Sequence, residues 1–228
     1  GPVWEIIGTL IFLIFITIIW SKLWNRAFFD YFGFLYTGYA IWKIMSTTIT
    51  ESTFLFSELY ANALRNMRCN PLSFCMGNSL KNIFILLLNL PIVLLITIYN
   101  ETLSLNGILL LSYYLIIFFI TSVCLSFIIA TLCVKFRDLQ YSVVVIMQLM
   151  FFITPVIWDP QQISEKGRFF LIDMNIFYHY VEFFRSSLLY GKVSLLSFCV
   201  VTVTSFILII LTGYIYYRVK NKLIFWVT

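Results

Sequence analysis

Aromatic side chains and a few charged side chains are the groups in this sequence that could do chemistry. Aromatic residues make up 19% of the chain. Trp and Tyr form belts at membrane interfaces, but the faces of aromatic rings also bind sugars, so a path lined by them could carry a glycan. Lys43 is the clear charge inside an otherwise apolar stretch. Such a charge either pairs inside a helix bundle or contacts an anionic substrate, and the residues alone leave both alternatives open.

Residues 135–158 set a cluster of charges against a long uncharged run. The cluster KFRD, at 135–138, holds three charges in four positions, and the next twenty residues hold none. This pattern is typical of a corner that Lys and Arg keep on the cytoplasmic side of a membrane, with Asp138 paired to Lys135 or Arg137. Because proline interrupts a helix, the run is expected to bend at Thr154-Pro155.

No catalytic constellation is present in the sequence. His179 is the only histidine, so the chain has neither a histidine pair for a metal nor an HExxH motif. No segment reads GxSxG or GxxxxGK[ST], the glycine-rich loop by which P-loop ATPases hold phosphates. The five cysteines form no CxxC pair and stand mostly among apolar residues, as small buried hydrophobic residues do. We therefore predict no catalytic residue, no metal site and no cofactor bound by this chain.

The composition places the chain in a membrane. Hydrophobic residues make up 61% of the chain and charged residues 11%, and the mean hydropathy is +0.96. Soluble domains carry about 25% charged residues, so a globule this apolar could not cover itself with a polar surface. The net charge of +5 comes without a basic run, which excludes a nucleic-acid partner. The fold class predicted is an all-α membrane protein.

Six membrane spans are predicted within a single domain at 1–228. A helix needs about 20 apolar residues to cross about 30 Å of hydrocarbon. Charge-free intervals place the spans at about 3–21, 31–50, 82–100, 107–134, 139–158 and 193–217.

The distribution of Lys and Arg orients these spans. The segments 51–81, 135–138 and 218–222 hold eight Lys and Arg, against six in the segments on the other side. Positive residues favour the cytoplasmic side, so both termini are predicted to be cytoplasmic.

Two segments are too polar to span. In 51–73, apolar residues recur at helical spacing and polar residues fill the other side, which indicates an amphipathic helix that ends near Asn70-Pro71. It is either a surface-lying connector or a lever that docks into a partner. The segment 159–192 holds short apolar pieces such as Ile176–Phe184 and indicates a re-entrant or interfacial helical hairpin on the outer face, between the fifth and sixth spans.

Three stretches, in this order, carry a resemblance to a known family. They are GPVWEIIGTLIFLIFITIIWSKLW at the start, KFRDLQ with QLMFFITPVIW in the middle, and NIFYHYVEFFRSSLLYG after them. Together they resemble the membrane (permease) subunit of type-2 ABC exporters of polysaccharides, the O-antigen, capsule and teichoic-acid exporter group, over essentially the whole chain. The chain enters its first apolar run at once, with no signal peptide. We therefore expect the interfacial helix with which this family begins to precede residue 1.

The resemblance implies an assembly and a substrate. Such a permease works as a homodimer with two ATP-binding subunits, which carry the ATP and Mg, in the bacterial inner membrane. Its substrate is a polysaccharide linked to a polyprenyl diphosphate lipid, moved from the cytoplasmic to the outer leaflet. The segment 52–68 would be the coupling helix that meets the ATPase, and 159–192 would form short helices at the channel exit.

The resemblance also implies roles for particular residues. The residues expected to couple to the ATPase are Glu58, Asn62, Arg65 and Asn66. The cations expected to bind the lipid diphosphate at the channel entrance are Arg68, Lys81, Lys135 and Arg137. The aromatic residues expected along the glycan channel and its exit are Phe151, Phe152, Trp158, Tyr178 and Tyr180.

The sequence departs from the family pattern at two places and leaves two other function classes open. Asn175-Ile176 stands where the family often has Asn-Pro, and Lys43 stands where an uncharged residue is expected. An ATP-independent flippase or secondary transporter would show more internal ionisable residues or repeats. A membrane-embedded glycosyl- or acyltransferase would need a catalytic histidine or an acidic motif at a membrane face, and His179 is the only histidine that could serve. O-antigen is the leading substrate, with capsule and teichoic acid as alternatives.

Overall fold

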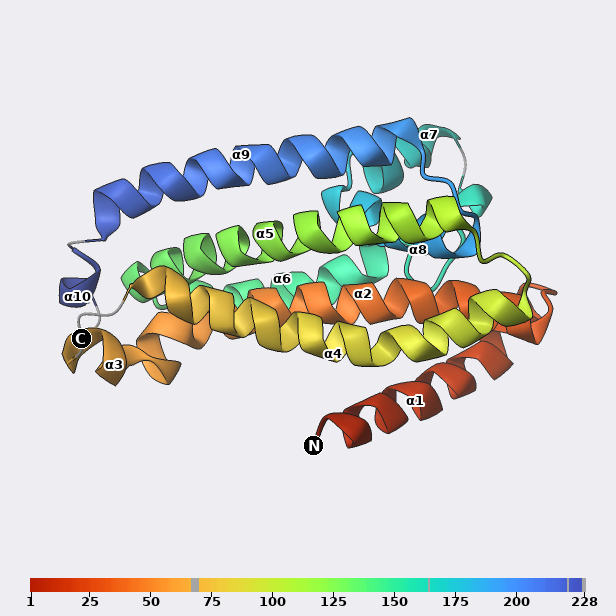
Figure 1. The fold of residues 1–228 in the computed structure, drawn as a ribbon, viewed down its shortest axis with the longest axis horizontal. Helices are drawn as coiled ribbons and strands as arrows, with labels where there is room; N and C mark the ends of the chain where they lie inside the picture. Colours follow the sequence, from red (N-terminus) through yellow and green to blue (C-terminus); the bar gives the residue numbers. More distant parts are fainter. Residues whose placement is uncertain (67–69, 164, 221, 227–228) are drawn as a thin grey trace. The chain divides into compact units, whose positions relative to one another are not determined.

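The computed structural model describes residues 1–66, 70–163, 165–220 and 222–226, and every regular element within them is a helix (Figure 1). The longer helices are α1 (Pro2–Leu23), α2 (Phe28–Phe54), α4 (Pro71–Tyr99), α5 (Leu105–Lys135), α6 (Leu139–Ile153), α8 (Ile176–Leu189) and α9 (Leu195–Val219). The short helices are α3 (Ala61–Asn66), α7 (Glu165–Arg168) and α10 (Leu223–Trp226). Two π-helical turns, η1 (Leu55–Leu59) and η3 (Phe169–Asp173), and a 3-10 turn, η2 (Pro160–Gln162), complete the described elements. The predicted all-α class is therefore found throughout the described residues.

The chain groups into two compact units. The first unit comprises Gly1–Lys43, Phe84–Tyr114 and Phe152–Val200, and the second comprises Ile44–Ile83, Leu115–Phe151 and Val201–Thr228. Helices α2, α4, α5, α6 and α9 contribute residues to both units. Each unit has its own buried interior.

Four helices of the described part are long and apolar enough to cross a membrane: Val3–Leu23 within α1, and α4, α5 and α9. The other two predicted spans correspond to α2 and α6. Helix α2 has 27 residues but carries Asp30, Lys43 and Glu51, and α6 has only 15 residues. The chain is a multi-pass helical membrane protein, and the count of six spans stays a prediction.

Local chemistry explains where the helices begin and end. Helix α4 begins at Pro71, because proline suits the first helical position, and the Asn70 side chain accepts a hydrogen bond from the Leu72 backbone N–H at 3.1 Å. The same helix therefore starts well before residue 82, where the predicted span began. Helix α6 ends at Ile153, since the residue before a proline avoids helical backbone. This confirms the predicted bend at Thr154-Pro155.

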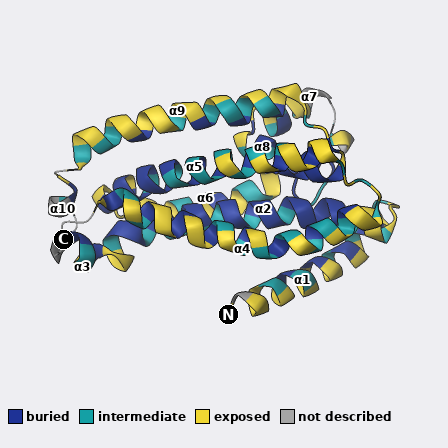
Figure 2. Cartoon of the chain, in the orientation of Figure 1, coloured by how far each residue is buried: buried dark blue, intermediate teal, exposed yellow. Residues whose placement is uncertain are grey.

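The predicted hairpin at 159–192 consists of η2, α7, η3 and α8. Asn175 caps α8, with its side chain accepting a hydrogen bond from the Tyr178 backbone N–H at 3.2 Å. Ile176 stands at the first helical position, where the family often has proline, and the Asn175 cap starts the helix without it. From His179 to Leu189, every residue of α8 except Glu182 is buried, whereas α1 and α9 carry many exposed residues (Figure 2). Helix α8 is thus the core helix of the first unit.

Candidate functional site

The segment predicted as the coupling helix is bent in the structure. Helix α2 runs on to Phe54, η1 follows, and α3 begins at Ala61. In η1 the Tyr60 backbone N–H donates to the Leu55 carbonyl at 3.0 Å, the wider hydrogen-bond spacing of a π-helix. We call residues 55–66 the elbow. A π-turn of this kind is common at functional sites.

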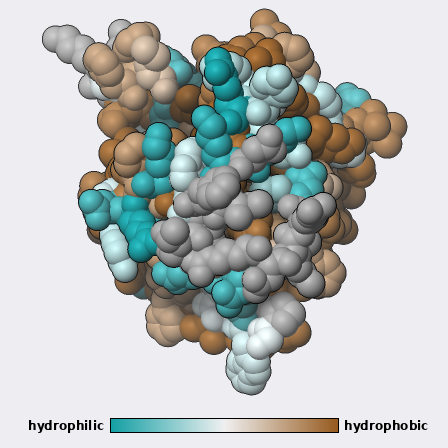
Figure 3. Space-filling view, turned by 90° about the vertical axis from the view of Figure 1, so that its left-hand side faces the viewer, coloured by the Kyte–Doolittle hydropathy of each residue, from teal (hydrophilic) through white to brown (hydrophobic). Residues whose placement is uncertain are grey.

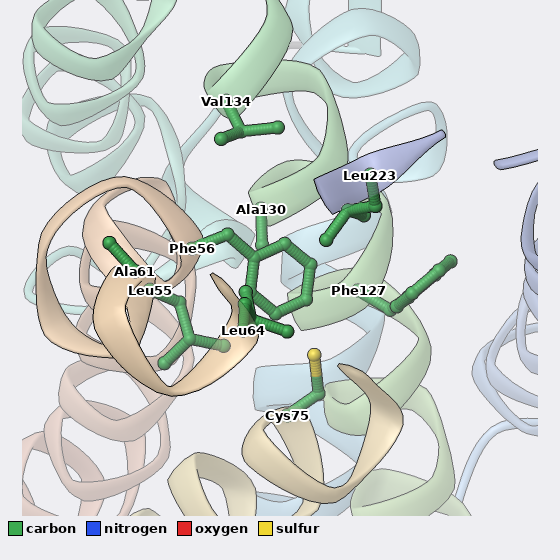
Figure 4. Packing of buried hydrophobic residues seen from close by; sticks show 9 residues of the cluster. All are labelled: Leu55, Phe56, Ala61, Leu64, Cys75, Phe127, Ala130, Val134 and Leu223. Carbon is green, nitrogen blue, oxygen red and sulfur yellow. The ribbon is translucent and has the colours of Figure 1, made fainter. Parts of the chain in front are cut away.

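A cluster of buried hydrophobic residues holds the elbow on the rest of the second unit (Figure 4). The ring of Phe56 lies at its centre and meets the ring of Phe127 on α5 edge-on, with ring centroids 6.2 Å apart. Leu64 of α3, Cys75 of α4 and Leu223 of α10 belong to the same cluster. The elbow therefore packs against α4, α5 and α10 rather than lying loosely on a surface.

The residues predicted to couple to the ATPase all lie on the elbow. Glu58 and Asn62 are exposed, and so is Leu59 between them. Arg65 and Asn66 form the last residues of α3, but their side chains lie outside the described residues, as does the whole of Arg68. The elbow thus presents a mixed polar and apolar exposed side, with its buried side fixed by the cluster.

The start of α6, directly after the corner at 135–138, is tied to the elbow and to the end of α2. The Gln140 side-chain amide donates a hydrogen bond to the Ser57 hydroxyl at 2.7 Å, and the Tyr141 ring meets the Phe54 ring edge-on. Lys135 lies over the ring of Trp226 in α10, with 5.4 Å from its Nζ atom to the ring centroid. The predicted coupling segment and the predicted entrance corner are therefore neighbours, which the sequence did not reveal.

Lys81, predicted at the entrance, has a partner within the second unit. Its ammonium group pairs with the Glu51 carboxylate of α2. The Asn82 amide donates to the other oxygen of Glu51 at 3.1 Å, and also lies 3.1 Å from the Thr48 hydroxyl oxygen. This polar contact joins α2 to α4, so Lys81 has a structural partner whatever it does at the entrance.

The exposed charges near α3, α10 and the α5–α6 corner, all in the second unit, are mainly positive. Figure 3 looks onto the end at which α3 and α10 lie, and hydrophilic residues gather there with hydrophobic residues around them. The exposed cations of these elements and their neighbours are Lys135, Arg137, Arg218, Lys220 and Lys222. Such a face suits an anionic group or the headgroups of an anionic membrane surface.

The five aromatic residues predicted to contact the glycan differ in their exposure. Phe152 is exposed, and its carbonyl accepts a hydrogen bond from the Trp158 indole N–H at 3.0 Å. Tyr178 and Phe151 are half-buried. Tyr180 is only 5% exposed and packs against Tyr114 of α5. Tyr180 therefore packs inside the first unit in this conformation, and its predicted contact with a glycan stays a prediction.

Lys43 takes the first of the two roles left open by the sequence. Its ammonium group lies 3.1 Å from the Glu5 carboxylate of α1 and donates to the Thr9 hydroxyl at 2.9 Å. The pair joins α1 to α2 within the first unit and lowers the cost of a charge inside an apolar helix.

His179 belongs to a hydrogen-bonded chain that holds α8 to η3 and to the start of α9. The Ser194 hydroxyl donates to the Ser197 oxygen at 2.9 Å, and Ser197 lies 3.0 Å from His179 Nδ1. Nε2 donates to the Asp173 carbonyl at 3.0 Å, which leaves Nδ1 to accept from Ser197. Burial lowers the pKa of the His179 imidazole below its ordinary value, in keeping with this neutral tautomer. Both ring nitrogens are therefore used by the structure.

The sequence did not reveal the structural role of Arg185. Its charge was counted as one of several in the 159–192 segment, but the structure buries the side chain fully on α8. Its guanidinium lies over the Phe34 ring at 3.7 Å from the centroid, and its Nη1 donates to Glu182 at 3.4 Å. Burial lowers the pKa of Arg185, an effect that Glu182 opposes, but an arginine starts so high that it stays charged. The spacing of Glu182 and Arg185 on a mostly apolar helix was the available signal.

These observations define the class of the protein: it is a helical, multi-pass membrane protein with a packed elbow and a group of exposed cations near it. The chain belongs to the ABC-2 type transporter family, whose model matches residues 1–189. A similar protein is the O-antigen export system permease protein RfbA of Klebsiella pneumoniae, 29% identical over 173 residues that make up 73% of this chain. The chain spans 64% of that relative's length.

Proposed function

We propose that this chain is the channel-forming permease subunit of an ATP-driven exporter that moves a polyprenyl-diphosphate-linked polysaccharide, O-antigen first among the candidates, across the bacterial inner membrane. The observation that carries the proposal is the contact between the elbow and the start of α6, two residues after the corner, through Ser57 and Gln140. It joins the segment that would meet an ATPase to the segment that would meet the lipid diphosphate. The name of the Klebsiella pneumoniae relative supports the substrate.

The proposal includes six spans with both termini in the cytoplasm. Helix α2 would be the second span, and the pairs of Lys43 with Glu5 and of Lys81 with Glu51 reduce the cost of its charges in lipid. Helix α6 would be the fifth, with the uncharged residues 154–158 completing its crossing.

The partners would be a second copy of the chain and two ATP-binding subunits that hold ATP and Mg. Glu58, Leu59 and Asn62 would contact those subunits, because they are, with Tyr60, the described exposed residues of an elbow that is otherwise anchored. When ATP closes the ATP-binding subunits, the push on the elbow would reach α5 through Phe56 and α6 through Gln140. The corner and the helix that leads to the exit would then move together.

Positive charge at the entrance would recognise the lipid diphosphate. Lys135 and Arg137 lie on the corner, and Lys81 lies on α4 with its charge already matched by Glu51. Guanidinium groups bind phosphate oxygens in pairs, so the entrance role depends most on Arg137, and the coupling role of the elbow is tested through Arg65. The aromatic residues Phe151, Phe152, Trp158 and Tyr178 would contact sugars farther along.

Arg137→Ala and Arg65→Ala should each reduce export about tenfold or more, the equivalent of one charge-assisted hydrogen bond of about 1.5–3 kcal/mol. The measurement is the lipid-linked glycan that accumulates inside a deletion strain complemented with each variant. Lys192→Ala is the matched control, because Lys192 is an exposed cation outside both segments.

Normal export by both arginine variants would remove the coupling and entrance roles together. Co-purification with an ATP-binding subunit encoded beside this chain tests the ATP dependence separately. If glycan moved without that subunit, an ATP-independent flippase would be the better description.

His179→Ala should destabilise the protein without touching transport chemistry. The change removes the two hydrogen bonds of a buried ring, at a cost of about 1–3 kcal/mol in the free energy of unfolding. Export per folded molecule is expected to stay within a factor of two, measured against the amount of protein in the membrane. A complete loss of export at normal protein levels would instead point to a catalytic histidine.

A further inference from the structure

The residues that follow α6, 154–159, are anchored one after another within the first unit. Thr154 accepts a hydrogen bond from the Asn175 amide at 3.1 Å, and the Ile157 carbonyl accepts one from the Tyr31 hydroxyl at 2.8 Å. Asp159 pairs with Arg26. The loop between α6 and η2 is therefore held from α2, from the α1–α2 connection and from the cap of α8.

Arg185 holds the middle of this loop. Its Nη2 donates to the carbonyls of Pro155 and Val156, at 3.2 and 3.3 Å. These two carbonyls belong to the backbone that leaves the helix at Thr154-Pro155, where no helical partner follows them. In an apolar surrounding an unpaired carbonyl is costly, so one guanidinium replaces the hydrogen bonds that the bend removes.

Gly38 makes room for that guanidinium. A Cβ atom at this position would overlap Nη2 of Arg185 and lie 3.1 Å from its Cζ atom. The end of an arginine can move, but this one is also fixed by the Phe34 ring and by Glu182. A side chain at Gly38 would therefore push Nη2 away from the two carbonyls.

We propose that Arg185 is a positioning residue that, with Gly38, fixes the 154–159 loop and so sets where Trp158 and the end of α6 stand at the exit. Its consequence for export rests on the proposed function, whereas the anchoring of the loop does not. Nothing in the position of Arg185 brings it into contact with a substrate, because its side chain is fully buried.

The test reads the loop directly through a thiol at Val156, which is fully buried. In the purified full-length chain with its ATP-binding partner, two cysteines are replaced by Ser: Cys199, the exposed cysteine among the described residues, and Cys69, which lies outside them. Val156→Cys is then introduced and its labelling by a maleimide is timed. We expect slow labelling in this background and at least tenfold faster labelling after Arg185→Lys, since an ammonium group cannot span both carbonyls and stack on a ring.

Gly38→Ala supplies an independent variant that keeps the arginine. It should speed labelling as Arg185→Lys does, and the two changes together should add little to either one, because both release the same contact. Arg168→Lys, an exposed arginine of the same segment, is the matched control and should leave the rate unchanged. Cys75, buried in the second unit, should stay unlabelled throughout.

Unchanged labelling of Val156→Cys in both variants would overturn the proposal. A parallel rise at Cys75 would overturn it as well, because the effect would then be general unfolding. Export of the glycan by the same variants is measured alongside. Faster labelling with normal export would uphold the anchoring role and count against the exit role in the proposed function.

Discussion

Phe56→Ala is expected to abolish most export, because it empties the centre of the cluster that holds the elbow. Phe56 is fully buried and meets Phe127 of α5 edge-on. Truncating a buried phenylalanine costs about 3–5 kcal/mol in the free energy of unfolding, from lost contacts and the cavity left behind. The same contact would carry motion from the elbow to α5. Export and the thermal unfolding of the purified complex are the two measurements.

Leu59→Ala is the matched control for the stability effect alone, because Leu59 is one of the residues proposed to contact the ATP-binding subunits. Leu59 lies in the same π-turn but is 61% exposed, so its truncation should alter the unfolding free energy by less than about 0.5 kcal/mol. A fall in export after Leu59→Ala, at unchanged stability, would place Leu59 at the contact with the ATP-binding subunit. Phe56→Ala with unchanged unfolding and export would show that the cluster does not transmit the motion.

A double change separates packing from transmission. If Phe56 and Phe127 act as one contact, removing both should cost less than the sum of the single changes. Phe56→Leu, which keeps most of the volume, should recover stability and export together. Recovery of stability without export would mean that the edge of the aromatic ring itself matters.

The long helices could be predicted because hydropathy and charge are properties of the chain itself. Each of the four qualifying spans overlaps a predicted interval but extends past it at one end or at both. The start of α4 was placed too late, at residue 82, because Lys81 interrupts the apolar run. In the structure Glu51 pairs with Lys81, so the charge does not end the helix. Reading boundaries from charge-free intervals fails wherever a charge finds its partner on another helix.

The geometry of the elbow and of the loop could not be predicted, because both depend on contacts distant in the sequence. Helical spacing over 51–73 identifies an amphipathic segment, but a π-turn at Leu55 depends on packing against α5 and α10. Arg185 likewise looks like an ordinary loop cation. Its role follows from carbonyls 29 and 30 residues away, and from a glycine on α2.

Arg26→Ala should lower the free energy of unfolding more than most single substitutions of partly exposed residues do. Its partner Asp159 is only 5% exposed, so the change leaves a buried carboxylate without its counter-ion. Breaking a buried pair costs about 3–5 kcal/mol. The Arg26 side chain is itself 37% exposed, and water screens such a charge, so we expect about 2 kcal/mol in the free energy of unfolding.

Asp159→Asn in the Arg26→Ala background distinguishes charge from shape. Oδ1 of Asp159 also accepts a hydrogen bond from the Gln161 backbone N–H at 2.9 Å and caps η2. An asparagine keeps that cap and carries no charge, so the double variant should recover at least half of the lost stability, measured by thermal unfolding. If the double variant were less stable than Arg26→Ala alone, the carboxylate would be held by something other than Arg26. The recovery would show that this end of the 154–159 loop depends on neutralising one buried charge, whereas its middle depends on the two carbonyls that Arg185 holds.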